Sequence, residues 1–240
     1  MLIPLGLAVL AGSILTGCES TQDKAKEIQA ENEQALAAEV GVEITQVNKG
    51  VKVVGTTLLH DQYGDAIVVE LQNTTNQAQV NLPILVDLRD AKGQSVYKND
   101  IPGLDPALGH VPLIRPGETV DWVNDQLVPS APPKSAKVKV GVSGETAPAK
   151  LPELAVSPAR IVNDPNGIVA QGTVTNTSQF DQMKLVLYAV ARAGGKIVAA
   201  GRGQFKNLKV GARPGKYDIF FIGDPSGADV TVTAPPSVLQ

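Results

Sequence analysis

The segment VELQNTT at residues 69–75 recurs as GTVTNTS at residues 172–178, and the match continues at the same offset without a gap. The apolar positions that follow correspond one to one: Leu82, Ile84, Val86 and Leu88 match Leu185, Leu187, Ala189 and Ala191. Every second residue is apolar in both copies, which is the period of a strand that buries one face. The chain therefore predicts an internal duplication of a β structure.

The duplication extends beyond this apolar strand. Arg89 corresponds to Arg192 at the end of the strand, and a polar turn follows in each copy. Further on, the tripeptide Arg-Pro-Gly at residues 115–117 recurs at residues 213–215, before a strand that carries Trp122 in one copy and Phe220 in the other. Proline presets φ and glycine admits positive φ, so we expect a tight turn at both tripeptides.

From Gly41 onward, short Val-rich segments are separated by Gly, Pro, Asn and Asp, which is typical of an all-β sandwich or barrel. Residues 42–45 (VEIT) and 137–142 (KVKVGV) alternate apolar and polar side chains, as half-buried antiparallel strands do. We expect two tandem β-sandwich domains, at residues 41–142 and 153–240, each of a size that suits seven strands. The Pro- and Ala-rich segment 143–152 is predicted to be the linker.

The order of these segments resembles the bacterial envelope modules called FxLYD domains. The residues that carry the resemblance are LVLYA at 185–189 and LPILVD at 82–87, within Ala66–Val123 and Ile168–Ile222. The resemblance implies an immunoglobulin-like β-sandwich in a secreted or lipid-anchored protein. It implies no catalytic or ligand-binding residues.

A short apolar run at the N-terminus, Leu5–Ile14, ends just before Leu15-Thr16-Gly17-Cys18, which contains the only cysteine. The run has the length of a signal-peptide core and is too short to span a bilayer. Together these residues resemble the lipobox of bacterial lipoproteins. The resemblance implies that residues 1–17 are a cleaved signal peptide and that Cys18 becomes the acylated first residue. The alternative is an ordinary cysteine after an uncleaved signal or a short buried helix.

Residues 18–40 form the expected lipidated N-terminus and stalk. The segment lacks Gly and Pro and is rich in Ala, Glu, Gln and Lys, which are good helix formers. Its apolar residues Ile28, Leu36 and Val40 form no continuous stripe, which favours a solvated helix or flexible tether over a coiled coil. We therefore expect a bacterial cell-membrane or outer-membrane protein that faces away from the cytoplasm. Its anchor would be the lipid on Cys18.

Composition excludes several classes of protein. Of the 240 residues 43% are hydrophobic, so the chain can build real cores, while aromatic residues are scarce at 4%. The net charge of −3 offers no basic excess for nucleic acid. With one cysteine there is no intrachain disulfide.

No cofactor, metal or catalytic site is predicted. Neither His60 nor His110 stands at a metal-ligand spacing from a second ligand type, and no Gly-x-Ser-x-Gly elbow occurs. The Asp-containing segments 163–167 and 223–229 could hold a hard cation, but Asp-Pro and Asn-Gly are ordinary turn formers. The tripeptides at Asn73 and Asn176 match glycosylation sequons and are expected to cap hairpins instead.

The leading functional hypothesis is a non-enzymatic, lipid-anchored interaction module whose partner is another envelope protein, bound by strand addition or loop contact. The alternative is a solute- or polysaccharide-binding lipoprotein of the envelope. Sugar sites are lined with aromatic rings, and this chain has one Trp and four Tyr, so the alternative is disfavoured.

Overall fold

The computed structural model describes residues 41–239, all of which belong to one compact unit. The expected signal peptide, Cys18 and the expected stalk lie outside these residues. The described chain is nearly all β, with fifteen strands and one short 3₁₀ turn at Pro106–Leu108, which confirms the all-β class. No helix in residues 41–239 is long and apolar enough to cross a bilayer.

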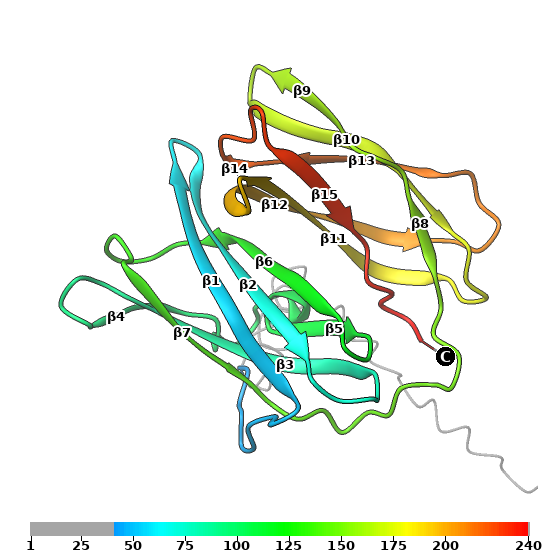
Figure 1. Ribbon diagram of the computed structural model, residues 1–240, viewed down its shortest axis with the longest axis horizontal. Coiled ribbons are helices and arrows are strands. Elements are labelled where there is room, and N and C mark those ends of the chain that lie inside the picture. The colour runs from blue at the N-terminus through cyan, green and yellow to red at the C-terminus, as the bar shows by residue number, and fades with distance from the viewer. Residues whose placement is uncertain (1–40, 240) are drawn as a thin grey trace, which may run out of the picture. The chain divides into compact units, whose positions relative to one another are not determined.

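The first half of the chain forms two antiparallel sheets (Figure 1). One has the order β1-β2-β6, and the other has β3 at its centre, flanked by β4 and β5 on one side and by β7 on the other. The strands are β1 (Val51–Asp61), β2 (Gly64–Asn73), β3 (Gln79–Arg89), β4 (Ser95–Lys98), β5 (His110–Ile114), β6 (Thr119–Leu127) and β7 (Ser135–Val140). The two sheets share one apolar core, because residues of β2, β3 and β6 belong to the same buried cluster.

The second half repeats this arrangement with eight strands. One sheet is β13-β10-β8 with β9 also on β10, and the other is β14-β12-β11-β15. The strands are β8 (Leu154–Val156), β9 (Arg160–Asp164), β10 (Gly167–Asn176), β11 (Gln182–Ala193), β12 (Lys196–Leu208), β13 (Gly215–Phe220), β14 (Ile222–Gly223) and β15 (Asp229–Thr233). Its core is a second buried cluster between the two sheets.

The sequence repeat is repeated in local structure. Strands β2 and β3 match β10 and β11 at the sequence offset, and every predicted inward residue of β3 and β11 is buried. Strand β1 corresponds to β8 and β9 taken together. The loop Ser157–Ala159 separates β8 from β9, and β1 has a bulge between Val53 and Gly55 at the corresponding place. In the first half, residues 99–109 contain the 3₁₀ turn and divide β4 from β5, whereas β12 of the second half is continuous.

Three sequence expectations about short segments were wrong. Residues 42–45 form no strand. The second Arg-Pro-Gly is not a tight turn, because the turn closes earlier, between the carbonyl of Lys209 and the N–H of Ala212, and Gly215 already begins β13. Finally, Trp122 lies opposite Val69, and the matching pair in the second half is Gly172 with Tyr217. Phe220 is therefore not the equivalent of Trp122.

Glycine at position 172 has a packing reason. A Cβ there would lie 2.3 Å from the Tyr217 hydroxyl oxygen, which is closer than atoms can approach. The Tyr217 hydroxyl in turn donates to the carbonyl of Ser157 at 3.2 Å. Because Gly172 has no side chain, the Tyr217 ring can lie over the backbone of β10. At the equivalent place in the first half, Val69 lies beside Trp122.

Strands β2 and β11 are buried on both faces, which the sequence analysis did not foresee. The inward residues of β11 belong to the core of the second half, but its outward Val186, Tyr188 and Val190 belong to the core cluster of the first half. Val68 of β2 and its partner Val123 of β6 lie in that same cluster. The two halves therefore pack sheet against sheet, and strands buried on both sides read as continuous apolar runs.

The expected linker, residues 143–152, contains no strand. Its Glu145 carboxylate accepts a hydrogen bond from the side-chain amide of Asn81, and the carbonyl of Pro152 accepts one from the Arg115 guanidinium at 3.2 Å. Both contacts are made with the first half. The domain boundaries themselves stay a prediction.

Candidate functional site

The residues that sequence analysis considered for chemistry lie apart. The only predicted modification site, Cys18, is outside the described residues. The exposed His60 ring contacts the Asp65 carboxylate at 2.9 Å, and His110 contacts the carbonyl of Pro106 at 3.1 Å. No group of three His, Cys, Asp or Glu side chains suited to a metal occurs within residues 41–239.

The Asp-containing turns are held by their own side chains, as expected. The Asp164 carboxylate accepts the backbone N–H of Asn166 at 2.9 Å, and the Asp224 carboxylate accepts that of Ser226 at 2.9 Å. Hydrogen bonds from Ser226 hold the pKa of Asp224 below its ordinary value. Both are Asx turns, in which the carboxylate stabilises the local backbone.

The two sequon asparagines are buried turn residues. The Asn73 side-chain oxygen accepts the N–H and hydroxyl of Thr75 at 2.9 and 2.8 Å, and Asn176 accepts the same groups of Ser178 at 3.0 and 2.7 Å. Each asparagine amide also donates to two or three backbone carbonyls, including that of Leu208 in the second copy. The expectation that they cap hairpins was wrong, because β2 does not pair with β3 and β10 does not pair with β11. Each asparagine instead caps the turn that carries the chain from one sheet to the other, and such buried amides cannot accept a glycan in the folded protein.

The polar centre of the contact between the halves is Arg192. Its guanidinium donates to both carboxylate oxygens of Asp121 at 2.9 and 2.7 Å and to Glu70 at 3.1 Å. The hydrogen bonds that the guanidinium donates to Asp121 are the largest cause that raises the pKa of Arg192. Bidentate pairing fixes the orientation of both partners, so this contact sets how β11 lies on β2 and β6.

A second polar contact lies around Arg202 of β12. Its backbone N–H donates to the Asp125 carboxylate at 2.8 Å, and its side chain, only 3% exposed, donates to Asp105 at 3.2 Å. Burial raises the pKa of Asp125 and that of the adjacent Tyr188 hydroxyl. The Tyr188 hydroxyl and Arg202 Nε are buried without a hydrogen-bond partner among the described residues.

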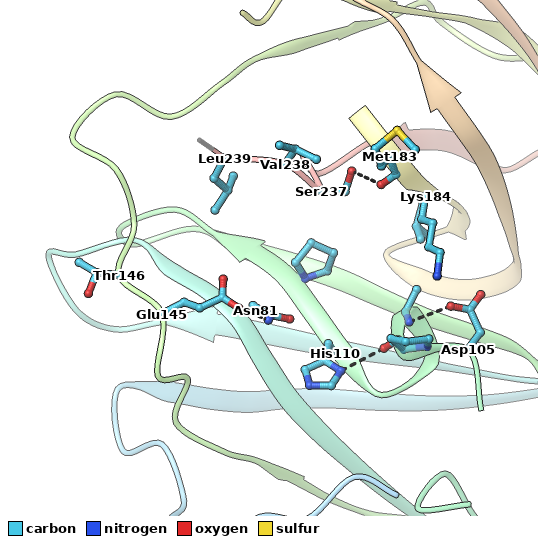
Figure 2. Close-up of a pocket in the computed structure, with 14 residues that line it drawn as sticks. Asn81, Asp105, His110, Glu145, Thr146, Met183, Lys184, Ser237, Val238 and Leu239 are labelled. Carbon is cyan, nitrogen blue, oxygen red and sulfur yellow. Dashed lines mark hydrogen bonds between the residues drawn. The ribbon is translucent and has the colours of Figure 1, made fainter. Parts of the chain in front are cut away.

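A cleft of about 480 Å³ opens beside this contact (Figure 2). Asp105 and Lys184 lie at one end of it and Asn81 and Glu145 at the other, while the C-terminal residues 237–239 form one wall. Asn81 and Lys184 are equivalent in the repeat, and they are the two described non-glycine residues with positive φ, at 45° and 50°. The cleft therefore lies beside the one described residue with left-handed backbone in the central strand of each copy.

A second groove, of about 490 Å³, lies along β15. Its lining combines Thr231 and Thr233 of β15 with the start of β8, the turn before β6 and the buried Tyr188 of β11. The charged residues of its lining are Arg115, Glu118, Asp121 and Glu153. This groove is bounded by a strand edge, which makes it suited to an extended segment rather than to a compact ligand.

No family model matches the chain, and no curated protein matches its sequence. The geometry of the described residues is therefore what bears on function. Sequence reasoning missed the contact between the halves and the groove along β15. The available signal was the apolar outward face of β11, where Val186, Tyr188 and Val190 stand between the predicted inward residues.

Proposed function

We propose that this protein is a non-enzymatic, lipid-anchored protein of the bacterial cell envelope that binds a partner protein through its β structure. The support for the anchor is the lipobox-like Leu15–Cys18 after an apolar run, with Cys18 as the acylated residue. Residues 18–40 would then be the stalk, attached to the cell membrane or the outer membrane.

We further assign the two halves to tandem immunoglobulin-like sandwiches. In that fold a strand of one sheet pairs with its hairpin neighbour and with a later strand, and the next strand starts the opposite sheet. The pairing of β2 with β1 and β6, and of β3 with β7, follows this order. The pairing of β10 and β11 with β13 and β15 follows it again.

The observation that carries a binding role is the fixed packing of the halves through Arg192 and the shared core. It joins two small modules into one platform whose grooves and strand edges are held in place. A preorganised surface loses little conformational entropy when it binds, so recognition of a protein partner gains from this rigidity. A sugar or solute site is less well supported. Tyr188 is the single Trp, Tyr or Phe among the residues that line the cleft and the groove along β15.

Two experiments test the proposal. Fatty-acid labelling in cells should mark the wild-type protein, while Cys18→Ala should abolish the label and leave an unprocessed chain. Cross-linking in intact cells, followed by solubilisation in detergent, should yield a specific envelope protein bound to the wild type. Labelling that survives Cys18→Ala contradicts the anchor. Failure to cross-link any protein, together with a large thermal shift by sugars or wall fragments, contradicts the protein-binding role.

A further inference from the structure

Strands β7 and β15 are equivalent edge strands of the two halves, but their outer edges differ in backbone pairing. In the first half Val47 forms an isolated bridge with Gly141, just beyond the end of β7. The N–H of Asn48 donates to the carbonyl of Val140 at 2.9 Å, and the N–H of Val142 donates to that of Gln46 at 3.1 Å. Among residues 41–239, β15 pairs with β11 alone. Among the described residues, a single bridge thus occupies the end of the β7 edge, and no residue pairs with the β15 edge.

Side chains of β7 and β15 differ in the same sense. Two exposed lysines, Lys137 and Lys139, alternate along β7, and lysines on an edge strand discourage further pairing. Strand β15 has the sequence DVTVT, with exposed threonines and no lysine. β-Branched residues favour strand pairing, so this edge is not protected against an added strand.

The core beneath the open edge is incompletely covered. Leu154 and Val156 of β8 and Val230 and Val232 of β15 pack against the core of the second half but stay partly exposed. In the first half, Val51, the equivalent of Leu154, is buried with 7% of its surface exposed. A strand added to β15 would place every second side chain over these partly exposed residues.

The other face of an added strand would meet the groove along β15. Two exposed carboxylates lie there, Glu118 and Glu153, and no salt bridge involves either of them within the described residues. Asp121 is already paired with Arg192, and the Arg115 side chain donates to the carbonyl of Pro152. The bond to a carbonyl leaves the positive charge of Arg115 in place, and the Glu118 carboxylate accepts the backbone N–H of Arg115 at 3.0 Å. Among the described residues, two carboxylates and one guanidinium of the groove thus have no ion-pair partner, and this net acidic balance complements basic side chains.

We propose that the edge of β15 accepts an extended segment of a partner protein in which apolar and basic residues alternate. The apolar residues cover the partly exposed core between β8 and β15, and the basic residues lie in the groove near Glu118 and Glu153. The added backbone continues the β14-β12-β11-β15 sheet beyond β15. This inference rests on the proposed protein-binding role and names the kind of segment that is bound.

The test uses the full chain in detergent and three labelled eight-residue peptides with blocked ends. The first alternates Val and Lys, the second alternates Val and Glu, and the third has the composition of the first with four Val followed by four Lys. We expect the alternating Val–Lys peptide to bind at least tenfold more tightly than either control. Hydrogen exchange should then slow at the backbone amides of β15 and not at those of β1 or β6.

Substitutions at the edge separate strand addition from general attraction. Thr231→Lys combined with Thr233→Lys gives β15 the protection that β7 has and should weaken binding at least tenfold. Thr56→Lys, the same change at an exposed position of β1, should leave binding within twofold of wild type. Equal binding of the two Val–Lys peptides, or protection that maps outside β15, overturns the inference.

Two further outcomes also decide against it. If the wild type self-associates and the β15 double variant becomes monomeric without any peptide binding, the edge serves a second copy. If the double variant still cross-links the envelope partner in cells as well as the wild type, binding lies elsewhere on the protein. That last result overturns the β15 site while the proposed function stands. A failure of lipid labelling would affect the proposed function alone.

Discussion

Arg89 and Arg192 occupy equivalent positions at the ends of β3 and β11, yet they bind in different directions. Arg89 pairs with Asp87 two residues away on its own strand, at 2.6 Å. The residue equivalent to Asp87 in the second half is Val190, whose side chain packs into the core of the first half. Because Val190 offers no carboxylate, the Arg192 guanidinium pairs with Asp121 and Glu70 of the first half instead. One replaced residue thus converts a local ion pair into a contact between halves.

Replacing Arg192 by Met should destabilise the protein by about 1–3 kcal/mol, because two carboxylates would remain facing the contact without a donor. Part of the guanidinium is exposed, so solvent screens the loss and keeps it below that of a fully buried pair. Urea unfolding of the full chain measures the change. Lys196→Met, at an exposed position of β12, is the control and should change stability by less than about 0.5 kcal/mol. Equal effects of the two substitutions would show that the pair contributes nothing.

Lys184 has φ at 50°, where a residue with a Cβ is strained. Lys184→Gly should therefore raise the free energy of unfolding by about 1 kcal/mol. Lys206→Gly on the neighbouring β12 should lower it by about 0.5–1 kcal/mol, since glycine only weakens a regular strand. Thermal or urea unfolding of both variants checks the opposite signs. Loss of stability in both would mean that Lys184 makes contacts worth more than its strain.

At the scale of elements, the turn after β2 and the turn after β10 are the same structure built twice. Asn176→Ala removes an acceptor for two groups of Ser178 and a donor to the carbonyls of Phe180 and Leu208. Because the Leu208 carbonyl bond is buried, we expect a loss of about 2–3 kcal/mol in the free energy of unfolding. Asn73→Ala should behave in the same way. Gln179→Ala, exposed in the same turn, should stay within about 0.5 kcal/mol of wild type.

Sequence reasoning predicted the strands whose residue pattern can arise in only one way. The β3 and β11 strands were readable because alternation follows directly from one buried face. The Pro-Gly turn before β13 was misread, since proline also fits an extended entry into a strand, and the actual turn uses Gly211 with φ at 67°. The groove along β15 could not be predicted, because it depends on which edge the chain leaves unpaired. That is a property of topology rather than of local pattern.

At the scale of the molecule, the contact between the halves contains carboxylates with opposite pKa shifts. Burial raises the pKa of Asp125; burial also acts on Asp105, but hydrogen bonds from the Ala107 N–H and from Arg202 outweigh it and hold the pKa of Asp105 below its ordinary value. Asp125 therefore lowers stability as pH rises through its raised pKa. Asp105 adds stability above its unfolded-state pKa of about 3.9, and that stability is lost as pH falls further.

Asp125→Asn should reduce the loss of unfolding free energy that Asp125 causes as pH rises above the ordinary carboxyl pKa. The amide oxygen can still accept the Arg202 backbone N–H, while the buried charge is removed. We expect the variant to gain stability relative to the wild type as pH rises from about 4 to 8, because only the wild type must ionise a buried carboxyl over this range. Urea unfolding at both pH values checks this. Asp224→Asn, an exposed turn residue, should retain the wild-type difference, and an unchanged difference in Asp125→Asn would refute the role of Asp125.

The shared core also makes a prediction about folding as a unit. Val186, Tyr188, Val190 and Ala200 belong to the second half by sequence but are buried in the core cluster of the first half. Cutting the chain between the halves would expose these side chains together with Val68 and Val123, and contiguous apolar surface of this kind promotes aggregation. We expect residues 41–240, produced without the first forty residues, to be soluble and to unfold in a single transition. Residues 41–142 and 153–240 produced separately should melt at lower temperature or aggregate, and calorimetry checks all three. Two transitions in the longer chain, each matching one separate half, would show that the halves are independent domains and that their contact adds little to stability.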